Sequence, residues 1–435
     1  MVATSIGYTL TLHPLMLYLR LLVNMINKVF SAEQLDDKDP LAHKAGAFSL
    51  PDNTIYLDGN SLGPLPKSAE KRAVEVVQEQ WGQGLITSWN KHQWISLPQQ
   101  VGDKIGELIG AQQGQVICCD SISINLFKVL SAALKMNPRR KVIATTRDNF
   151  PTDIYMVQGL LDLLGEEYSI RYVDEASISS QLTDDIAVLM LTQVNFRSGL
   201  KLDMKGITEQ AHAKGILMLW DLAHSAGAFP VCLDDCNVDF AVGCSYKYLN
   251  GGPGAPAFIY VARRHQDSYQ QPLSGWMGHS APFSFSPDYA PDSSVKQNLC
   301  GTPGVIGMSI LDAALDVFDD VSLKAIDEKS KKLQAFFIAE AKRAGVLEYF
   351  GVASPPINCR GSQLALSHDE AYAICQAWIA EGVIADFRAP NILRIGFAPL
   401  YLSFADVEKA VTRLAIIMNE KRYENATFQQ RQSVT

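Results

Sequence analysis

Short apolar runs alternate with amphipathic segments through the middle of this chain, and this alternation restricts the possible folds most strongly. Runs typical of buried strands cover 141–145, 186–191, 216–220, 238–243 and 257–261. Segments with the 3.6-residue periodicity of helices cover 68–82, 97–110, 124–135, 152–164 and 205–213. Strands that alternate with helices in this way predict an α/β fold, with a mostly parallel sheet that helices cover on both faces.

The pattern changes after about residue 300. The later segments predict helices over 323–344, 369–380 and 403–419 and short strands over 363–366, 383–386 and 392–395. This order predicts a smaller C-terminal α+β domain that begins near Pro303. A chain of 435 residues has room for one large domain and such a partner.

Composition excludes several classes of partner. The net charge is −8 and there is no long basic run, so neither nucleic acid nor an anionic membrane is expected as the main partner. Eight scattered cysteines are too few for a disulfide scaffold and favour a reduced, cytoplasmic interior. Cys232 and Cys236 have no second pair at zinc spacing, so no metal site is expected.

The N-terminal segment does not have the features of a targeting sequence. Residues 10–23 are apolar, but the run is short for a membrane span and is interrupted by His13, Pro14 and Arg20. It has neither the positive start nor the small-residue cleavage site of a signal peptide. We predict that residues 1–24 are an extension that is dispensable for activity.

Lys247 and Asp221 are the candidates for catalysis. Asp221 ends the strand-like run 216–220, with His224 three residues on, and Lys247 follows the run 238–243 between two tyrosines. Ligands of α/β sheets bind at the carboxyl ends of strands. A lysine that forms a Schiff base and an acid that keeps a ring nitrogen protonated suit pyridoxal phosphate. Singly, each residue is more often a surface lysine or a capping aspartate, but the pair with its flanking sequence favours the cofactor site.

Three further features have two interpretations each. Asp120-Ser121-Ile122-Ser123 precedes a helix and offers N–H groups and hydroxyls to a phosphate, or simply caps the helix. Phe150 could stack on a flat cofactor, with Asp153 as a second acid nearby, or act as a hydrophobic staple. Arg394 lies in an apolar strand and could clamp a substrate carboxylate or form an internal ion pair.

Spaced motifs in the right order resemble those of kynureninases. They are 56–63, 150–153, 221–224, 245–250, 275–276 and the ending 393–394 with 399–401. The resemblance runs from about Phe30 to Ile417. Two positions depart from the family pattern, Ile122 where threonine is common and Met277 where an aromatic residue is common.

The resemblance implies a homodimeric pyridoxal phosphate enzyme of fold type I, the aspartate aminotransferase-like fold, with a seven-stranded type of sheet and active sites at the subunit interface. It implies hydrolysis of L-kynurenine, and of its 3-hydroxy derivative, at the Cβ–Cγ bond in tryptophan catabolism. The implied parts of the chain are 25–60, packed on the small domain, 61–302, the large cofactor domain, and 303–435, the small domain.

Residue by residue, the resemblance implies catalytic roles for Lys247, Tyr246 and Asp221. It implies that the cofactor contacts Ile122, Ser123, Phe150, Asp153, Thr192, Asp221, His224, Tyr246, Lys247, Trp276 and Thr302, of which Trp276 and Thr302 would reach across the dimer interface. It implies that Asn60, Ser61 and Arg394 contact the substrate. Gly301-Thr302 resemble the bacterial form, which favours the unhydroxylated substrate.

Two other functions are compatible with the same fold. A cysteine desulfurase would need an exposed nucleophilic cysteine on a late loop, for which Cys359 is the candidate. A catalytically silent binding protein would lack the lysine or the arginine, and both are present.

Overall fold

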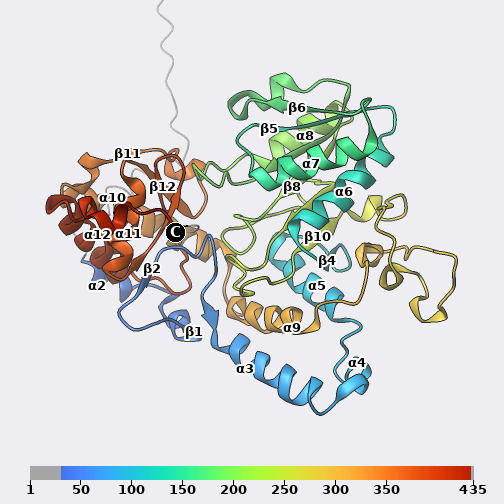
Figure 1. The fold of residues 1–435 in the computed structure, drawn as a ribbon, viewed down its shortest axis with the longest axis horizontal. Helices are drawn as coiled ribbons and strands as arrows, with labels where there is room; N and C mark the ends of the chain where they lie inside the picture. Colours follow the sequence, from blue (N-terminus) through green and yellow to red (C-terminus); the bar gives the residue numbers. More distant parts are fainter. Residues whose placement is uncertain (1–30, 433–435) are drawn as a thin grey trace, which may run out of the picture.

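The computed structural model describes residues 31–432, and its large domain is built on a seven-stranded sheet (Figure 1). In spatial order the strands are β4 (Val116–Cys118), β10 (Phe258–Val261), β9 (Phe240–Gly243), β8 (Leu217–Asp221), β7 (Ile186–Thr192), β5 (Val142–Thr146) and β6 (Ser169–Val173). Neighbours from β9 to β6 pair in parallel, and β10 is antiparallel to both of its neighbours. The predicted mostly parallel sheet is confirmed.

Helices cover both faces of this sheet. Alternate residues of one strand belong to different apolar clusters; Leu189 packs with one cluster and Met190 with the other. The helices α6 (Ile122–Met136) and α7 (Pro151–Leu164) contribute to the cluster of Met190. The helices α5 (Leu97–Ile109) and α8 (Met204–Ala213) contribute to that of Leu189. Burial on both faces explains why these strands read as continuous apolar runs.

The C-terminal domain is a smaller α+β unit. Its four-stranded sheet has the order β11 (Gly351–Val352), β12 (Gln363–Ser367), β15 (Ile392–Gly396) and β14 (Asp386–Arg388), with all pairs antiparallel. The helices of this domain are α10 (Leu323–Arg343), α11 (Ala371–Ala380), α12 (Phe404–Asn419) and the short α13 (Ala426–Gln429). The helix before it, α9 (Val305–Ala314), packs against α3 (Lys67–Glu75) and α5.

The single strand predicted over 383–386 is wrong. The structure divides it into β14 and β13 (Val383–Ile384), and β13 leaves the sheet to pair in parallel with β2 (Ile55–Tyr56) near the N-terminus. The same N-terminal segment contains α2 (Ala32–Asp36), whose Asp36 carboxylate accepts hydrogen bonds from the first N–H groups of α12, at 2.7 Å from Phe404 N and 3.0 Å from Ala405 N. Two separate contacts therefore fasten this segment to the small domain.

The helix predicted over 68–82 also differs. The α-helix α3 ends at Glu75, and the chain continues as a π-helical turn (Val76–Trp81) before the short α4 (Ser88–Lys91), at the bottom of Figure 1. The two-residue strands β1 (Phe48–Ser49) and β3 (Leu65–Pro66) pair antiparallel just before α3. The predicted extension, 1–24, lies outside the described residues.

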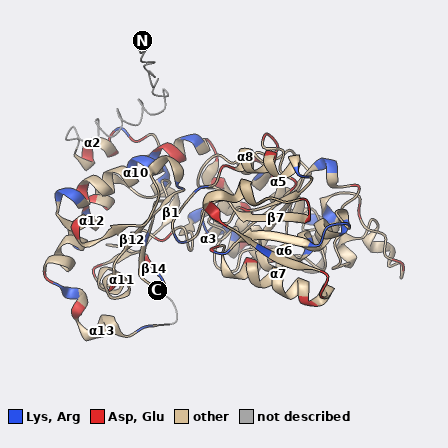
Figure 2. Cartoon of the chain, turned by 90° about the horizontal axis from the view of Figure 1, so that it is seen from above, with Lys and Arg blue, Asp and Glu red and all other residues tan. Residues whose placement is uncertain are grey.

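Several general properties follow from the described part of the chain. Between residues 31 and 432 no helix has the length and apolar character that a membrane crossing requires. All eight cysteines are free, and no group of three possible metal ligands occurs among the described residues. The ribbon positions of basic and acidic residues are interspersed along the chain in Figure 2.

Candidate active site

The carboxyl ends of β7 and β8 place Thr192 and Asp221 side by side. The two residues are paired in the parallel register, and Thr192 Oγ1 lies 3.3 Å from Asp221 Oδ2. Asp221 Oδ1 accepts from the N–H of Ala223 at 2.7 Å. Asn149, which the sequence did not single out, accepts a hydrogen bond from the Thr192 hydroxyl and so fixes its orientation.

A second carboxyl group faces Asp221 from the first turn of α7. Asp153 is fully buried, and neither of its oxygens accepts a hydrogen bond from a described residue. Burial, and then the charge of Asp221, raises the pKa of Asp153 well above its ordinary value. Burial raises the pKa of Asp221 too, but the charge of Lys247 and the N–H of Ala223 oppose this rise, so a proton on the pair resides on Asp153 and Asp221 is the anion.

Lys247 and His224 meet across the ends of β9 and β8. Lys247 Nζ lies 3.0 Å from His224 Nε2. Burial, reinforced by the charge of Lys247, lowers the pKa of His224 well below its ordinary value. The imidazole is therefore neutral and accepts the hydrogen bond, while its buried Nδ1 has no partner among the described residues.

Two aromatic rings face the lysine amine. The ring centroids of Phe150 and Tyr246 each lie 5.9 Å from Lys247 Nζ. Phe150 is 41% exposed and meets Phe196 edge-on at 5.3 Å, so its ring borders the site rather than the core. Burial, and then Cys244, raises the pKa of Tyr246, so its hydroxyl keeps its proton at neutral pH.

Glycine at position 63 allows the N-terminal motif to reach the lysine loop. A Cβ atom there would lie 2.3 Å from the carbonyl oxygen of Lys247 and 2.5 Å from Asn250 Oδ1. The N–H of Gly63 donates to the carbonyl of Tyr246 at 2.8 Å. The motif 56–63 thus supports the backbone that carries Lys247.

The helix at the expected phosphate end begins earlier than predicted. Helix α6 starts at Ile122, and Ser121 is its N-cap, with Oγ accepting from Ile124 N at 3.5 Å. The expected start at 124 is wrong because Ser121, not Ser123, caps the helix. Ile122 and Ser123 therefore supply first-turn N–H groups that lack intrahelical partners, as an anion site requires.

Arg394 forms an internal ion pair, which is one of the two roles that the sequence allowed for it. Its Nε lies 3.0 Å from Asp386 Oδ1 and its Nη2 2.5 Å from Asp386 Oδ2, and both side chains are 1% exposed. Nη2 also donates to Ser61 Oγ at 2.7 Å, and Nη1 to the carbonyl of Phe196 at 2.7 Å. When the side-chain amide of Asn60 is rotated so that its oxygen faces Arg394, this oxygen accepts from Arg394 Nε at 2.9 Å.

Sequence reasoning missed Asp386. It lies eight residues before Arg394 but directly opposite it on the neighbouring strand, and Arg388 also contacts it at 2.7 Å. An acidic residue at a strand position in an otherwise apolar segment was the available signal. The candidate substrate residues Asn60, Ser61 and Arg394 do lie together.

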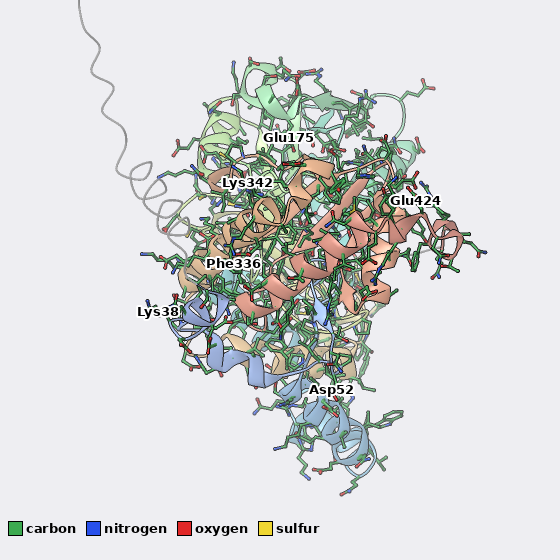
Figure 3. All side chains as sticks on the ribbon, turned by 90° about the vertical axis from the view of Figure 1, so that its left-hand side faces the viewer. Lys38, Asp52, Glu175, Phe336, Lys342 and Glu424 are labelled. Atoms are coloured by element: carbon green, nitrogen blue, oxygen red, sulfur yellow. The ribbon has the colours of Figure 1, made fainter. Side chains whose placement is uncertain are left out.

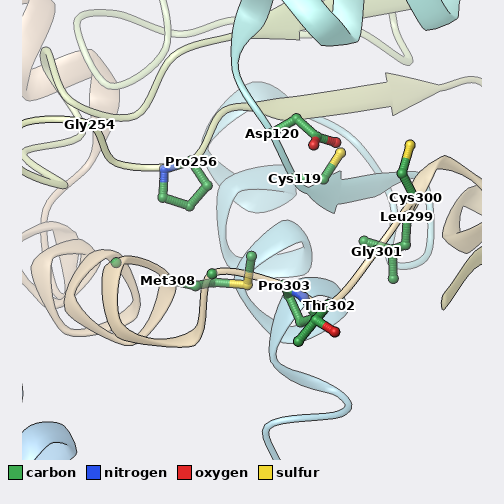
Figure 4. Close-up of a pocket in the computed structure, with 12 residues that line it drawn as sticks. Cys119, Asp120, Gly254, Pro256, Leu299, Cys300, Gly301, Thr302, Pro303 and Met308 are labelled. Carbon is green, nitrogen blue, oxygen red and sulfur yellow. The ribbon is translucent and has the colours of Figure 1, made fainter. Parts of the chain in front are cut away.

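Two candidates lie apart from this group. The ring of Trp276 packs on Phe283 and Phe285, in the loops at the right of Figure 1. Thr302 lines a cavity of about 340 Å³ together with Asp120, Gly254 and Cys300 (Figure 4). Neither residue contacts Lys247 within its own chain in the described part.

The arrangement fits pyridoxal phosphate. A ring nitrogen that carries a proton needs an anion such as Asp221, a phosphate needs helix N–H groups, and an aldehyde needs an amine such as Lys247. The unpartnered buried atoms of Asp153 and His224 are the polar groups that such a ligand would be expected to satisfy.

Comparison with known proteins gives full-length relatives. Kynureninase of Burkholderia pseudomallei (strain 1106a) is 47% identical over 409 residues, which cover 92% of this chain and 98% of the relative. Kynureninase of Deinococcus radiodurans is 47% identical over 394 residues, which cover 89% and 96%. The family described as Kynureninase C-terminal domain matches residues 326–414.

Solved structures with the same fold are much more distant in sequence. The apo cysteine desulfurase of Thermococcus onnurineus NA1 has a TM-score of 0.72 at 15% identity, covering 89% of this chain and 98% of that one. The cysteine desulfurase CsdA of Escherichia coli has a TM-score of 0.71 at 17% identity, covering 90% and 100%. A cystine C-S lyase bound to its product has a TM-score of 0.72 at 16% identity, covering 84% and 98%. These likenesses confirm fold type I and carry no further conclusion.

Proposed function

Because this chain belongs to the kynureninase family, we propose that the site around Lys247 is where it hydrolyses L-kynurenine to anthranilate and L-alanine with pyridoxal phosphate as cofactor. Its 3-hydroxy derivative is proposed as a second substrate. The observation that carries the assignment of the site is the meeting of Lys247, His224, Asp221 and Asp153 at the carboxyl ends of neighbouring strands.

The residues divide the work of holding the cofactor. Lys247 would take its aldehyde, Asp221 would accept from its ring nitrogen, and Phe150 would stack on the ring. Ile122 and Ser123 would hold its phosphate through their backbone N–H groups. Isoleucine at 122 removes the hydroxyl that a threonine there would supply, but its backbone N–H can still donate. Bound pyridoxal phosphate supplies an electron-accepting ring that stabilises negative charge at the substrate's Cα.

Lys247 is proposed as the base that would take the substrate's α-proton, since its amine would lie beside Cα when the cofactor is bound. The neutral His224 orients the lysine amine through the 3.0 Å contact. Asp153, which holds its own proton, leaves the anionic charge to Asp221, the residue that faces the cofactor's nitrogen.

Tyr246 is proposed as the general acid of the later steps. Its ring lies beside Lys247, and its raised pKa keeps the hydroxyl protonated and able to donate. A positioned acid of this kind accelerates a reaction by about 10²–10⁴-fold. Water adds at the γ-carbonyl, and the Cβ–Cγ bond then breaks to release anthranilate.

Arg394 is proposed as the residue that fixes the substrate's α-carboxylate. The ion pair with Asp386 occupies its Nε edge and holds the guanidinium rigidly in place. Nη2 donates to Asp386 and Ser61, and Nη1 donates to the Phe196 carbonyl, so the second N–H of Nη1 is the donor left for a substrate among the described residues. Fixed orientation of the scissile bond is the entropic contribution of such a clamp.

The proposed function is tested by the product it releases. Purified protein supplied with pyridoxal phosphate and L-kynurenine should produce the fluorescence of anthranilate. The same preparation should release no sulfide from cysteine, although Cys359 is exposed. Sulfide without anthranilate would overturn the proposal in favour of a desulfurase, and neither product would favour a silent homologue.

A homodimer with shared active sites is also proposed. Trp276, Phe283 and Phe285 are 41%, 60% and 75% exposed and pack on one another, which is a large apolar surface for a monomer to expose. Trp276 and Thr302 lie away from Lys247 of their own chain, and would serve the site of the other subunit.

Mixing two inactive variants tests this sharing. A hybrid of Lys247→Ala and Trp276→Ala subunits has one site with both residues intact, so the mixture should regain activity after exchange of subunits. If each site uses only its own chain, no hybrid has an intact site and activity stays absent.

The remaining expectations stay proposals. A cytoplasmic location agrees with eight free cysteines, which a reducing compartment preserves. The fastening of α2 and β2 to the small domain supports the grouping of 25–60 with it, whereas α9 packs on α3 and α5 of the large domain, which counts against a boundary between 61–302 and 303–435 as early as 303.

A further inference from the structure

Asp58 lies half-buried in a cluster of charges next to the proposed carboxylate clamp. The backbone of Leu57 bonds to both sides of the small domain, with its N–H donating to Ile384 at 2.7 Å and its carbonyl accepting from Gly396 at 2.7 Å. This fixes the next residue, Asp58, beside Asp386, Arg388 and Arg394. Nothing in the proposed function uses Asp58.

The hydrogen bonds of this cluster give Asp386 several donors but leave Asp58 Oδ1 without one. Asp386 receives bonds from Arg394, Arg388 and the Ser61 hydroxyl, the last at 2.8 Å. A hydroxyl has one hydrogen, and that of Ser61 goes to Asp386. Asp58 Oδ1 is buried without a partner among the described residues. An ionised carboxylate in that position is costly.

The balance of charges leads to the same conclusion. Two carboxylates, Asp58 and Asp386, face two guanidiniums, Arg388 and Arg394, so the fully ionised cluster has no net charge. It gains one positive charge only when a carboxylate is protonated. An incoming substrate carboxylate adds a negative charge beside Arg394, and the cluster accommodates it best with Asp58 neutral.

Other groups around Asp58 do not compensate its charge. Tyr56, Tyr248 and Tyr401 face it from three different parts of the chain, and Cys375 faces it from α11. Burial, and then the charge of Asp386, raises the pKa of Asp58 to about 7, against the smaller influence of Ser61 and the arginines. Its protonation therefore changes in the neutral range.

We propose that Asp58 is a positioning residue that couples binding of the substrate's α-carboxylate to uptake of a proton. This proposal rests on the proposed function, since it takes Arg394 as the clamp. Protonated Asp58 leaves Arg394 free to hold the carboxylate. Ionised Asp58 neutralises the cluster and weakens the clamp.

The test measures protons taken up when a carboxylate binds. The probe is 4-(2-aminophenyl)-4-oxobutanoate, the analogue of kynurenine that lacks the α-amine. It keeps the carboxylate and the ketone but cannot displace Lys247. Calorimetric titration of the holoenzyme in phosphate and in Tris, whose ionisation enthalpies differ, gives the number of protons bound. At pH 7 the wild type should take up about half a proton, and its Kd should rise about tenfold between pH 6 and 8.5.

Asp58→Asn has nearly the same shape without the charge. At pH 7 its proton uptake on binding the probe should be smaller than that of the wild type by about half a proton. Its Kd should stay near the value that the wild type has at pH 6 across the whole pH range. Asp58→Ser is a second neutral variant with the same expected result if the asparagine does not fold. Asp52→Asn changes an exposed carboxylate of the same segment (Figure 3) and should behave as the wild type does.

The outcomes separate this proposal from the proposed function. Equal proton uptake by the wild type and a neutral Asp58 variant, or no uptake by the wild type, overturns the role of Asp58. Release of anthranilate by the same wild-type preparation is measured independently, and its absence would overturn the proposed function instead.

Discussion

Lys247 Nζ and His224 Nε2 lie 3.0 Å apart, at the ends of two neighbouring parallel strands. Burial keeps the histidine neutral, and a neutral imidazole can accept a hydrogen bond from the lysine amine at this nitrogen. One hydrogen bond thus fixes the direction of the amine on which the proposed chemistry depends.

We expect His224→Ala to lower kcat by about 10²-fold, because the amine loses its orientation while the cofactor keeps its other contacts. Anthranilate fluorescence at saturating kynurenine measures this. His43→Ala, at an exposed histidine of the N-terminal segment, is the control and should leave kcat unchanged. Wild-type kcat in His224→Ala would show that the contact has no role in turnover.

Gly63→Ala should destabilise the fold by about 1–3 kcal/mol, because the new methyl group overlaps the Lys247 carbonyl and the backbone must move. Thermal unfolding and retention of cofactor absorbance after gel filtration should both decrease. Gly159→Ala is the matched control. Position 159 is exposed in α7 with nothing within 4 Å of a Cβ, so alanine there should stabilise the helix slightly. Equal effects of the two variants would contradict this account of position 63.

Arg394→Lys should raise the KM for kynurenine by at least tenfold with a smaller effect on kcat. One ammonium cannot hold Asp386, Ser61 and a substrate carboxylate as the planar guanidinium does. Steady-state kinetics at a single pH measures the split between KM and kcat. An unchanged KM would count against the clamp.

Asp239 lies at the opposite end of the sheet and should control stability in acid. Burial alone would raise the pKa of Asp239, but hydrogen bonds from His212, His265 and the N–H of Met218 outweigh it and lower the pKa. A lowered pKa in the folded state means that this contribution is fully present above the unfolded value of about 4 and is lost as the pH falls through the folded value.

Asp239→Asn should therefore lower the melting temperature at pH 7, by an amount equivalent to about 1–3 kcal/mol. The difference from the wild type should persist down to about pH 4 and narrow below it. Melting curves from pH 7 to pH 3 measure this. A difference that grows as the pH falls below 4 would contradict the assignment.

Much of the fold and the centre of the site could be predicted because their signals are local. Buried parallel strands read as apolar runs, and Asp221 and Lys247 each follow one directly. The strands β4 and β6 were missed because β4 has three residues and β6 is a partly exposed edge strand. The start of α6 was misplaced because two serines could both have capped it.

The charge cluster could not be predicted because it joins distant parts of the chain. Asp58 and Asp386 are far apart in sequence, and tertiary contacts such as the pairing of β2 with β13 and the bond from Gly396 to Leu57 bring their segments together. No local pattern indicates that Arg394 is already paired, or that a carboxylate beside it lacks a partner.

The central claim is that Lys247 carries the cofactor, and borohydride tests it most directly. Reduction of the pyridoxal phosphate-loaded protein converts the link between lysine and cofactor into a stable bond, and peptide mapping then locates the label. We predict a single labelled peptide with the modification on Lys247. A label on another lysine, or no label in protein saturated with the cofactor, would contradict the account.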